Sequence, residues 1–240
     1  GGESREEWLC RLVDEELIVM DAAMGGHLEV VEMLLERVQG VDVNVTSENW
    51  SGATALLMAS QNGHPEVVRL LLASSDIDVN QARTDNECTP LFQACSNGHA
   101  HVVELLLASS GINVNQPHQD GATPLYAACQ EGHSEIVRQL LSVKKSTNPP
   151  INIHQPVQEG EEKDCTPLIV ASYVGSASCV EQLLCFDDNI IDCVSVIFEE
   201  KNVLAWAQPT ARSIGLSFLD EEINIHGREK VVQLLVDVGA

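Results

Sequence analysis

Positive charge and aromatic side chains are scarce in this sequence. Its 240 residues contain 13 Lys and Arg against 36 Asp and Glu, and the formal net charge is −23. Phosphate backbones repel a chain of this charge, so we expect no nucleic-acid partner. The acidic surplus either keeps an extended surface in solution or attracts a basic partner, and composition alone leaves both readings open.

Long apolar runs are missing as well. A helix that crosses a bilayer needs about 20 apolar residues in a row, and no stretch of this chain approaches that length. The opening GGESREEW is acidic and polar, unlike a secretory signal peptide. We therefore expect no membrane insertion and a cytoplasmic (intracellular, reducing) location. Aromatic residues make up 4% of the chain, which favours helices that pack through small and aliphatic side chains.

Motifs for catalysis and metal binding are also absent. The sequence has no G-x-S-x-G, H-E-x-x-H, P-loop or dinucleotide-binding glycine motif, and it has no C-x-x-C pair. The remaining candidate zinc ligands lack any standard spacing; they are Cys179, Cys185, Cys193 and His226. We expect no catalytic residues, no metal, no cofactor and no enzymatic activity.

What the sequence does contain is one pattern written three times. The copies are GATALLMASQNGHPEVVRLLLA at 52–73, ECTPLFQACSNGHAHVVELLLA at 87–108 and GATPLYAACQEGHSEIVRQLLS at 121–142. A threonine near the start of the pattern recurs, at steps of 35, 34 and 43 residues, as Thr54, Thr89, Thr123 and Thr166. A period of about 33 residues is typical of arrays whose units bury their apolar faces only against neighbouring units.

Each copy predicts two short helices joined by a turn. Thr123 is suited to cap the first helix, and Pro124 fits its first position because a missing N–H costs nothing there. Gly132 ends this helix, as a C-terminal glycine does. The apolar residues expected to face the core fall at helical spacing; they are Leu125, Ala128, Cys129, Ile136, Val137, Leu140 and Leu141.

An alternating segment follows each pair of helices. Apolar and polar residues alternate at 41–44, 77–80, 112–115 and 151–154, with Asp, Asn and Gly nearby. Alternation with a period of two residues is typical of β-strands. We therefore expect an extended, strand-like arm and a turn between units.

These motifs resemble the ankyrin-repeat family, whose pattern is roughly D-x-x-G-x-T-P-L-H-x-A-A-x-x-G-H-x-x-V-V-x-L-L-L-x-x-G-A-D-V-N. The resemblance implies a mainly α, ankyrin-repeat solenoid of helix-turn-helix units with β-hairpin-like arms, with five clear repeats plus a degenerate sixth. One departure recurs, because the histidine of T-P-L-H is replaced by Leu57, Phe92, Tyr126 and Ile169. The replacement removes a polar contact that this position commonly makes to the adjacent turns.

The predicted organisation follows the repeat pattern. A capping helix is expected at 3–13, and repeats at 14–48, 49–83, 84–117, 118–160 (with an elongated loop) and 161–196. A degenerate repeat at 197–240 carries an insertion at 209–226.

The repeated histidines and cysteines are expected to be structural. The histidines share one position at the start of the second helix, where an imidazole can bond the preceding turn; they are His27, His64, His99 and His133. Cys95 and Cys129 share one small position in the first helix. Cysteine thus serves as a small apolar residue, and we expect all eight cysteines to be reduced.

The resemblance also implies where a partner binds. Members of the family usually bind partners in the concave groove made by the arm tips and the first helices. The candidate partner-binding residues at these positions are Trp50, Ser51, Gln61, Asn62, Asp85, Asn86, Ser96, Asn97, Gln119, Asp120, Gln130, Glu131 and Tyr173. Trp50 and Tyr173 are the large rings of this set, and each is either a binding anchor or an ordinary exposed ring.

Two functions remain open on the sequence alone. The first is a non-catalytic, monomeric adaptor or scaffold that binds a partner protein or peptide, which the acidic charge suggests is basic. The second is the substrate-targeting or regulatory arm of a larger enzyme or channel whose catalytic part lies elsewhere. The full-length open reading frame discriminates between them.

Overall fold

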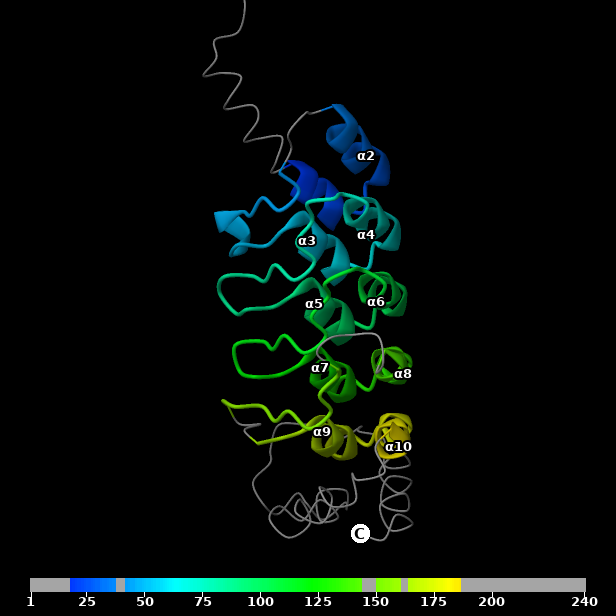
Figure 1. The fold of residues 1–240 in the computed structure, drawn as a ribbon. Helices are drawn as coiled ribbons and strands as arrows, with labels where there is room; N and C mark the ends of the chain where they lie inside the picture. The colour runs from blue at the N-terminus through cyan, green and yellow to red at the C-terminus, as the bar shows by residue number, and fades with distance from the viewer. Residues whose placement is uncertain (1–17, 38–41, 144–149, 161–163, 187–240) are drawn as a thin grey trace, which may run out of the picture. The chain divides into compact units, whose positions relative to one another are not determined.

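The structure, a computed structural model, describes residues 18–37, 42–143, 150–160 and 164–186. The chain divides into two compact units, Gly1–Gln119 and Asp120–Ala240. The described part of each unit consists of short helices joined by tight turns and by long arms (Figure 1). The capping helix expected at 3–13 and the degenerate repeat expected at 197–240 lie outside the described residues.

Unit 1 is built from helix-turn-helix pairs. Helical residues 18–24 precede α2 (Leu28–Arg37), and the short 3-10 helix η1 (Glu48–Trp50) lies in the arm that follows. Two further pairs are α3 (Ala55–Gln61) with α4 (Pro65–Leu72) and α5 (Pro90–Ser96) with α6 (Ala100–Leu107). α3 packs against α5 and α4 against α6, so first helices form one layer and second helices another (Figure 1). The arms project from the side of the first helices.

Unit 2 repeats this arrangement. α7 (Pro124–Gln130) pairs with α8 (Ser134–Ser142), and α9 (Pro167–Val174) pairs with α10 (Ala177–Phe186). α7 packs against α9 and α8 against α10. The residues predicted to face the core are all buried; they are Leu125, Ala128, Cys129, Ile136, Val137, Leu140 and Leu141. The predicted mainly α repeat fold is confirmed.

Threonine hydroxyls cap α3, α5, α7 and α9, as predicted. The Oγ1 atoms of Thr54, Thr89, Thr123 and Thr166 accept hydrogen bonds of 3.2, 3.1, 3.2 and 3.4 Å from the backbone N–H three residues further on. Proline occupies the first position of α5, α7 and α9. A cap of this kind stabilises a helix by about 1 kcal/mol, so these four threonines fix where the helices begin.

The glycine–histidine turns join neighbouring repeats in unit 1. Nε2 of His64 lies 2.9 Å from the carbonyl oxygen of Met24, and Nε2 of His99 lies 3.0 Å from that of Gln61. Each imidazole donates to the end of the preceding repeat's first helix, which confirms the predicted contact at these two positions. A Cβ on Gly63, where φ is +71°, would lie 2.5 Å from Nδ1 of His99, so only glycine fits beside the ring.

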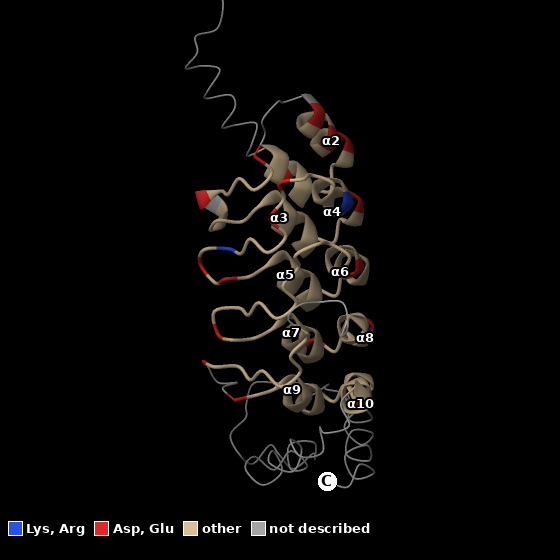
Figure 2. Cartoon of the chain, viewed as in Figure 1, with Lys and Arg blue, Asp and Glu red and all other residues tan. Residues whose placement is uncertain are grey.

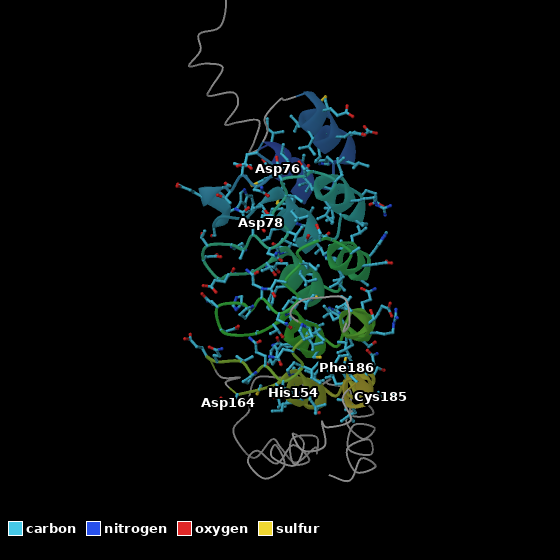
Figure 3. All side chains as sticks on the ribbon, in the orientation of Figure 1. Asp76, Asp78, His154, Asp164, Cys185 and Phe186 are labelled. Carbon is cyan, nitrogen blue, oxygen red and sulfur yellow. The ribbon has the colours of Figure 1, made fainter. Side chains whose placement is uncertain are left out.

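Asparagine side chains tie each arm of unit 1 to the following one. Nδ2 of Asn44 donates to the carbonyl of Asp76 over 2.7 Å, and its Oδ1 accepts from the N–H of Asp78 over 2.8 Å. Asp76 and Asp78 lie at the start of that following arm (Figure 3). Asn80 makes the same two bonds, both 2.8 Å, to the backbone around Gly111. The side-chain amide of each asparagine thus donates one hydrogen bond to the following arm and accepts another from it.

These bonds lie in the segments where we expected an extended, strand-like arm and a turn. The described residues form no strand, and their one isolated antiparallel bridge joins Ser47 to Ala53. At 77–80 the chain forms a turn and no strand, and Asp78 Oδ1 accepts from the N–H of Asn80 over 2.9 Å. Val79 between them is buried. The alternation in the sequence therefore reflects alternate burial, and at these segments asparagine side chains connect the arms.

We predict that His99→Ala lowers the free energy of unfolding by about 1 kcal/mol, because the Gln61 carbonyl loses a hydrogen bond that links two repeats. His101 is the matched control, since it is exposed on α6. His101→Ala should stay within about 0.5 kcal/mol of the wild type in urea denaturation. Equal stabilities of the two variants would contradict the linking role of His99.

Candidate functional site

The predicted binding residues fall into two sets in the structure. The arm tips comprise Trp50, Ser51, Asp85, Asn86 and Gln119 in unit 1 and Asp120 in unit 2. The first-helix ends comprise Gln61, Asn62, Ser96 and Asn97 in unit 1 and Gln130, Glu131 and Tyr173 in unit 2. All thirteen lie among the described residues.

Trp50 is the most prominent side chain of the arm tips. The residue is 41% exposed, although hydrogen bonds hold its backbone. The N–H of Trp50 donates to the Ser47 carbonyl, and its own carbonyl accepts from the N–H of Ala53, both over 3.1 Å. A closed turn of this kind presents a large ring to solvent at little cost in conformational entropy on binding.

Neighbouring tips of unit 1 are bonded to each other. Ser51 adopts the left-handed conformation, with φ 55° and ψ 41°. Its carbonyl oxygen accepts from both the N–H and the hydroxyl of Thr84, each over 2.9 Å. Further along the same unit, the N–H of Gln119 donates to the Asn86 carbonyl over 3.0 Å. These bonds fix the spacing between successive tips.

Asp85 lies in an ion pair that the sequence pattern did not predict. Its carboxylate is 2.7 Å from the guanidinium of Arg83, and the two side chains are 40% and 23% exposed. Partial desolvation raises the pKa of Asp85, but hydrogen bonds from Arg83 and Ser51 outweigh it, so the pKa lies below its usual value. Asp85 is therefore charged at neutral pH, and part of its charge is balanced by Arg83 on the same tip. Exposed pairs of this kind add little stability.

Several predicted binding residues use their polar groups within the fold. Nδ2 of Asn97 donates to the Gln61 carbonyl over 2.8 Å, and Nδ2 of Asn62 donates to the Met58 carbonyl over 2.8 Å. Oδ1 of Asn86 accepts from the N–H of Cys88 over 3.0 Å. These amides shape helix ends and turns, so they offer a partner fewer hydrogen-bonding groups than their sequence positions indicate.

The predicted residues of unit 2 divide in the same way. Oδ1 of Asp120 accepts from the N–H of Ala122 over 2.8 Å, and its carbonyl accepts from the N–H of Gln158 over 2.7 Å. Glu131 is exposed at the end of α7, while Gln130 and Tyr173 are half-buried. Glu131 is thus the accessible carboxylate of this set in unit 2.

At Phe92, where the resemblance led us to expect the loss of a polar contact, the structure has an aromatic contact. The ring of Phe92, in the place of the family's histidine, stacks on His118 with a centroid separation of 5.3 Å and an interplanar angle of 21°. The stack connects the first helix α5 to the arm that leads to the next tip. Sequence reasoning missed it because His118 lies outside the repeated pattern.

The described cysteines are free thiols, and most of them are buried. Cys88, Cys95, Cys129 and Cys179 are buried, and Cys185 is exposed near the end of α10 (Figure 3). Burial raises the pKa of Cys95. Hydrogen bonds from Cys129 and Ser176 lower the pKa of Cys179 to about 7, against the effect of burial. Within the described ranges, no three His, Cys, Asp or Glu side chains are grouped closely enough to hold a metal ion.

None of the helices that the structure describes is long and apolar enough to span a membrane. A family model for ankyrin repeats matches the chain in three overlapping copies, at residues 19–118, 77–153 and 110–196.

Three curated proteins are similar to shorter segments of the chain. A probable E3 ubiquitin-protein ligase of Oryza sativa subsp. japonica, XBOS33, is 53% identical over 51 residues, which cover 21% of this chain and 9% of that protein. A second one, XBOS32, is 45% identical over 64 residues, which cover 27% of this chain and 12% of that protein. The ankyrin repeat and KH domain-containing protein mask-1 of Caenorhabditis elegans is 35% identical over 72 residues, which cover 30% of this chain and 3% of that protein. The matched part of the chain therefore spans between 3% and 12% of the length of these relatives.

We predict that Gly52→Ala disturbs the junction of the first two tips. Gly52 has φ +75°, and a Cβ there would lie 2.6 Å from Cγ2 of Thr84. Gly111 is the matched control, because it has φ +79° but no atom within 4 Å of the added Cβ. Both alanine variants bear the cost of a left-handed backbone, about 1–2 kcal/mol. The clash should lower the unfolding free energy of Gly52→Ala by about 1 kcal/mol more. Identical urea midpoints and slopes for the two variants would show that Thr84 does not restrain the tip.

Proposed function

Because the chain belongs to the ankyrin-repeat family, we propose that it is a non-catalytic protein–protein interaction module. It acts as an adaptor or scaffold that binds a partner protein or peptide through its arm tips and first-helix ends. The presence of buried, free thiols supports a reducing, cytoplasmic location.

The exposed ring of Trp50 carries this proposal. The described residues expose three large hydrophobic side chains, Ile18, Met33 and Trp50, and only Trp50 belongs to the arm tips. Tryptophan is enriched among the residues that dominate binding energy at interfaces. Trp50 is not one of the buried core residues, which supports a role as an anchor for a partner.

The charge of the tips supports a basic or polar partner. Asp and Glu lie at the arm tips of both units (Figure 2). Glu48, two residues before Trp50 in the same 3-10 helix, is exposed, and Glu87 is exposed on the next tip. An aromatic ring beside carboxylates suits the side chain of Lys or Arg, which can contact the ring face and pair with the acid. Such charges mainly raise the association rate and the salt dependence of binding.

Binding by Trp50 is tested with peptides selected on the wild-type chain from a phage-displayed random library. We predict that Trp50→Ala weakens the selected peptides at least tenfold, which corresponds to about 1.4 kcal/mol, without lowering the melting temperature. Met33→Ala is the matched control, because Met33 is 43% exposed but lies on α2. We also expect the selected peptides to be enriched in Lys and Arg. Selected peptides that bind Trp50→Ala as tightly as the wild type would contradict the proposal.

A second candidate function is the substrate-targeting arm of a larger enzyme. Two of the similar proteins are probable E3 ubiquitin-protein ligases, and the segments they share with this chain cover 9% and 12% of their lengths. The full-length open reading frame tests this alternative, since it requires a catalytic domain encoded before residue 1 or after residue 240. The interaction proposed for the tips is compatible with either arrangement.

A further inference from the structure

Unit 1 contains a cleft away from the arm tips. The cleft lies where α4 and α6 end and the arms begin, and its volume is about 650 Å³. Its apolar wall includes Leu72, Ile77, Val79 and Leu105. The volume falls within the range of roughly 300–1,000 Å³ that is typical of ligand pockets. No residue of the arm tips or first-helix ends lines this cleft.

The charge of the cleft is opposite to that of the chain. Arg69, exposed on α4, is the one charged residue that lines it, whereas the chain as a whole carries −23. The structure describes three arginine side chains, and two of them are paired, Arg83 with Asp85 and Arg138 with Glu135. Arg69 has no ion-pair partner among the described residues. Its guanidinium is thus available to a carboxylate from outside.

The hydroxyl groups of Ser74 and Ser110 add hydrogen-bonding capacity to the cleft, whereas those of Ser109 and Ser75 are already used. Ser109 Oγ donates to the Leu105 carbonyl over 3.1 Å, and Ser75 Oγ donates to Asp76 over 3.0 Å. Ser74 and Ser110 also line the cleft, and within the described ranges their hydroxyls have no hydrogen-bond partner. They are free to bond a carboxylate or a peptide group.

We propose that this cleft binds a short peptide segment of a partner protein in which an acidic residue is flanked by aliphatic side chains. The aliphatic groups pack on Leu72, Ile77, Val79 and Leu105, and the carboxylate pairs with Arg69. Charge complementarity selects this partner, because an apolar wall with a single unpaired cation favours an anionic, apolar segment over a basic one. The site is independent of the tips, whose partner has the opposite charge.

The proposal is tested by methyl NMR of the isotope-labelled full chain with two matched peptides, acetyl-Leu-Glu-Leu-amide and acetyl-Leu-Gln-Leu-amide. We expect saturable shifts of the Leu72, Ile77, Val79 and Leu105 methyl groups in the millimolar range. The Glu peptide should bind about threefold more tightly than the Gln peptide, which is the effect of an exposed charge pair. Arg69→Gln should abolish that ratio, since the carboxylate of the Glu peptide then has no cation to pair with.

Arg138→Gln is the control, because it makes the same change of charge at an exposed position in unit 2 and should keep the ratio. Trp50→Ala should also keep the ratio of the two peptide affinities, because Trp50 does not line the cleft. The test of the cleft is therefore distinct from the test of binding at the tips. Absence of saturable shifts at the four residues would overturn the proposal. Equal affinities of the two peptides for the wild type, or an unchanged ratio in Arg69→Gln, would overturn it as well.

Discussion

Hydrogen bonds between successive repeats are the constraint on which the described structure of unit 1 depends. A single pair of short helices leaves the carbonyl groups at the end of its first helix and the backbone of its arm without partners. In unit 1 the following repeat supplies the imidazole of His64 or His99 to the helix end. The side chain of Asn44 or Asn80 bridges the two arms. Each repeat is therefore completed by its neighbour, which is why the pattern has to recur in the sequence.

This constraint separates the positions that build the fold from those that can bind. The capping threonines, the turn glycines and the buried aliphatic residues are engaged in packing and hydrogen bonding wherever the pattern occurs. Trp50 and Glu48 make no comparable contribution to the core and face solvent. The bond from Thr84 to Ser51 holds neighbouring tips at a fixed spacing. The tip residues that differ between repeats therefore lie on a backbone that hydrogen bonds hold in place. A rigid support lowers the entropy lost on binding.

The helices and their caps could be predicted because they depend on residues a few positions apart. Thr123 and Pro124 specify a helix start, and Gly132 with His133 specifies the turn, without knowledge of the rest of the fold. The arms were less predictable. Alternation at 77–80 suggested a strand, yet Asn80 bonds the following arm through its side chain. Sequence periodicity reports which residues are buried, and it does not report which atoms make the hydrogen bonds.

The candidate site illustrates the same limit. Variation between repeats predicted Asn97 and Asp120 as partner-binding residues, and it gave no sign that their side chains bond the backbone of helix ends and turns. The Arg83–Asp85 pair and the cleft beside Arg69 depend on residues brought together by folding, and no spacing rule identifies them.

Hydrogen–deuterium exchange of the Asn80→Ala variant tests the central claim most directly. If neighbouring repeats complete each other, the substitution should accelerate exchange in its own arm at 77–81 and also in the following arm at 111–116, where the Asn113 N–H loses its acceptor. Faster exchange confined to 77–81 would show that each repeat holds its arm by itself, and would contradict the account.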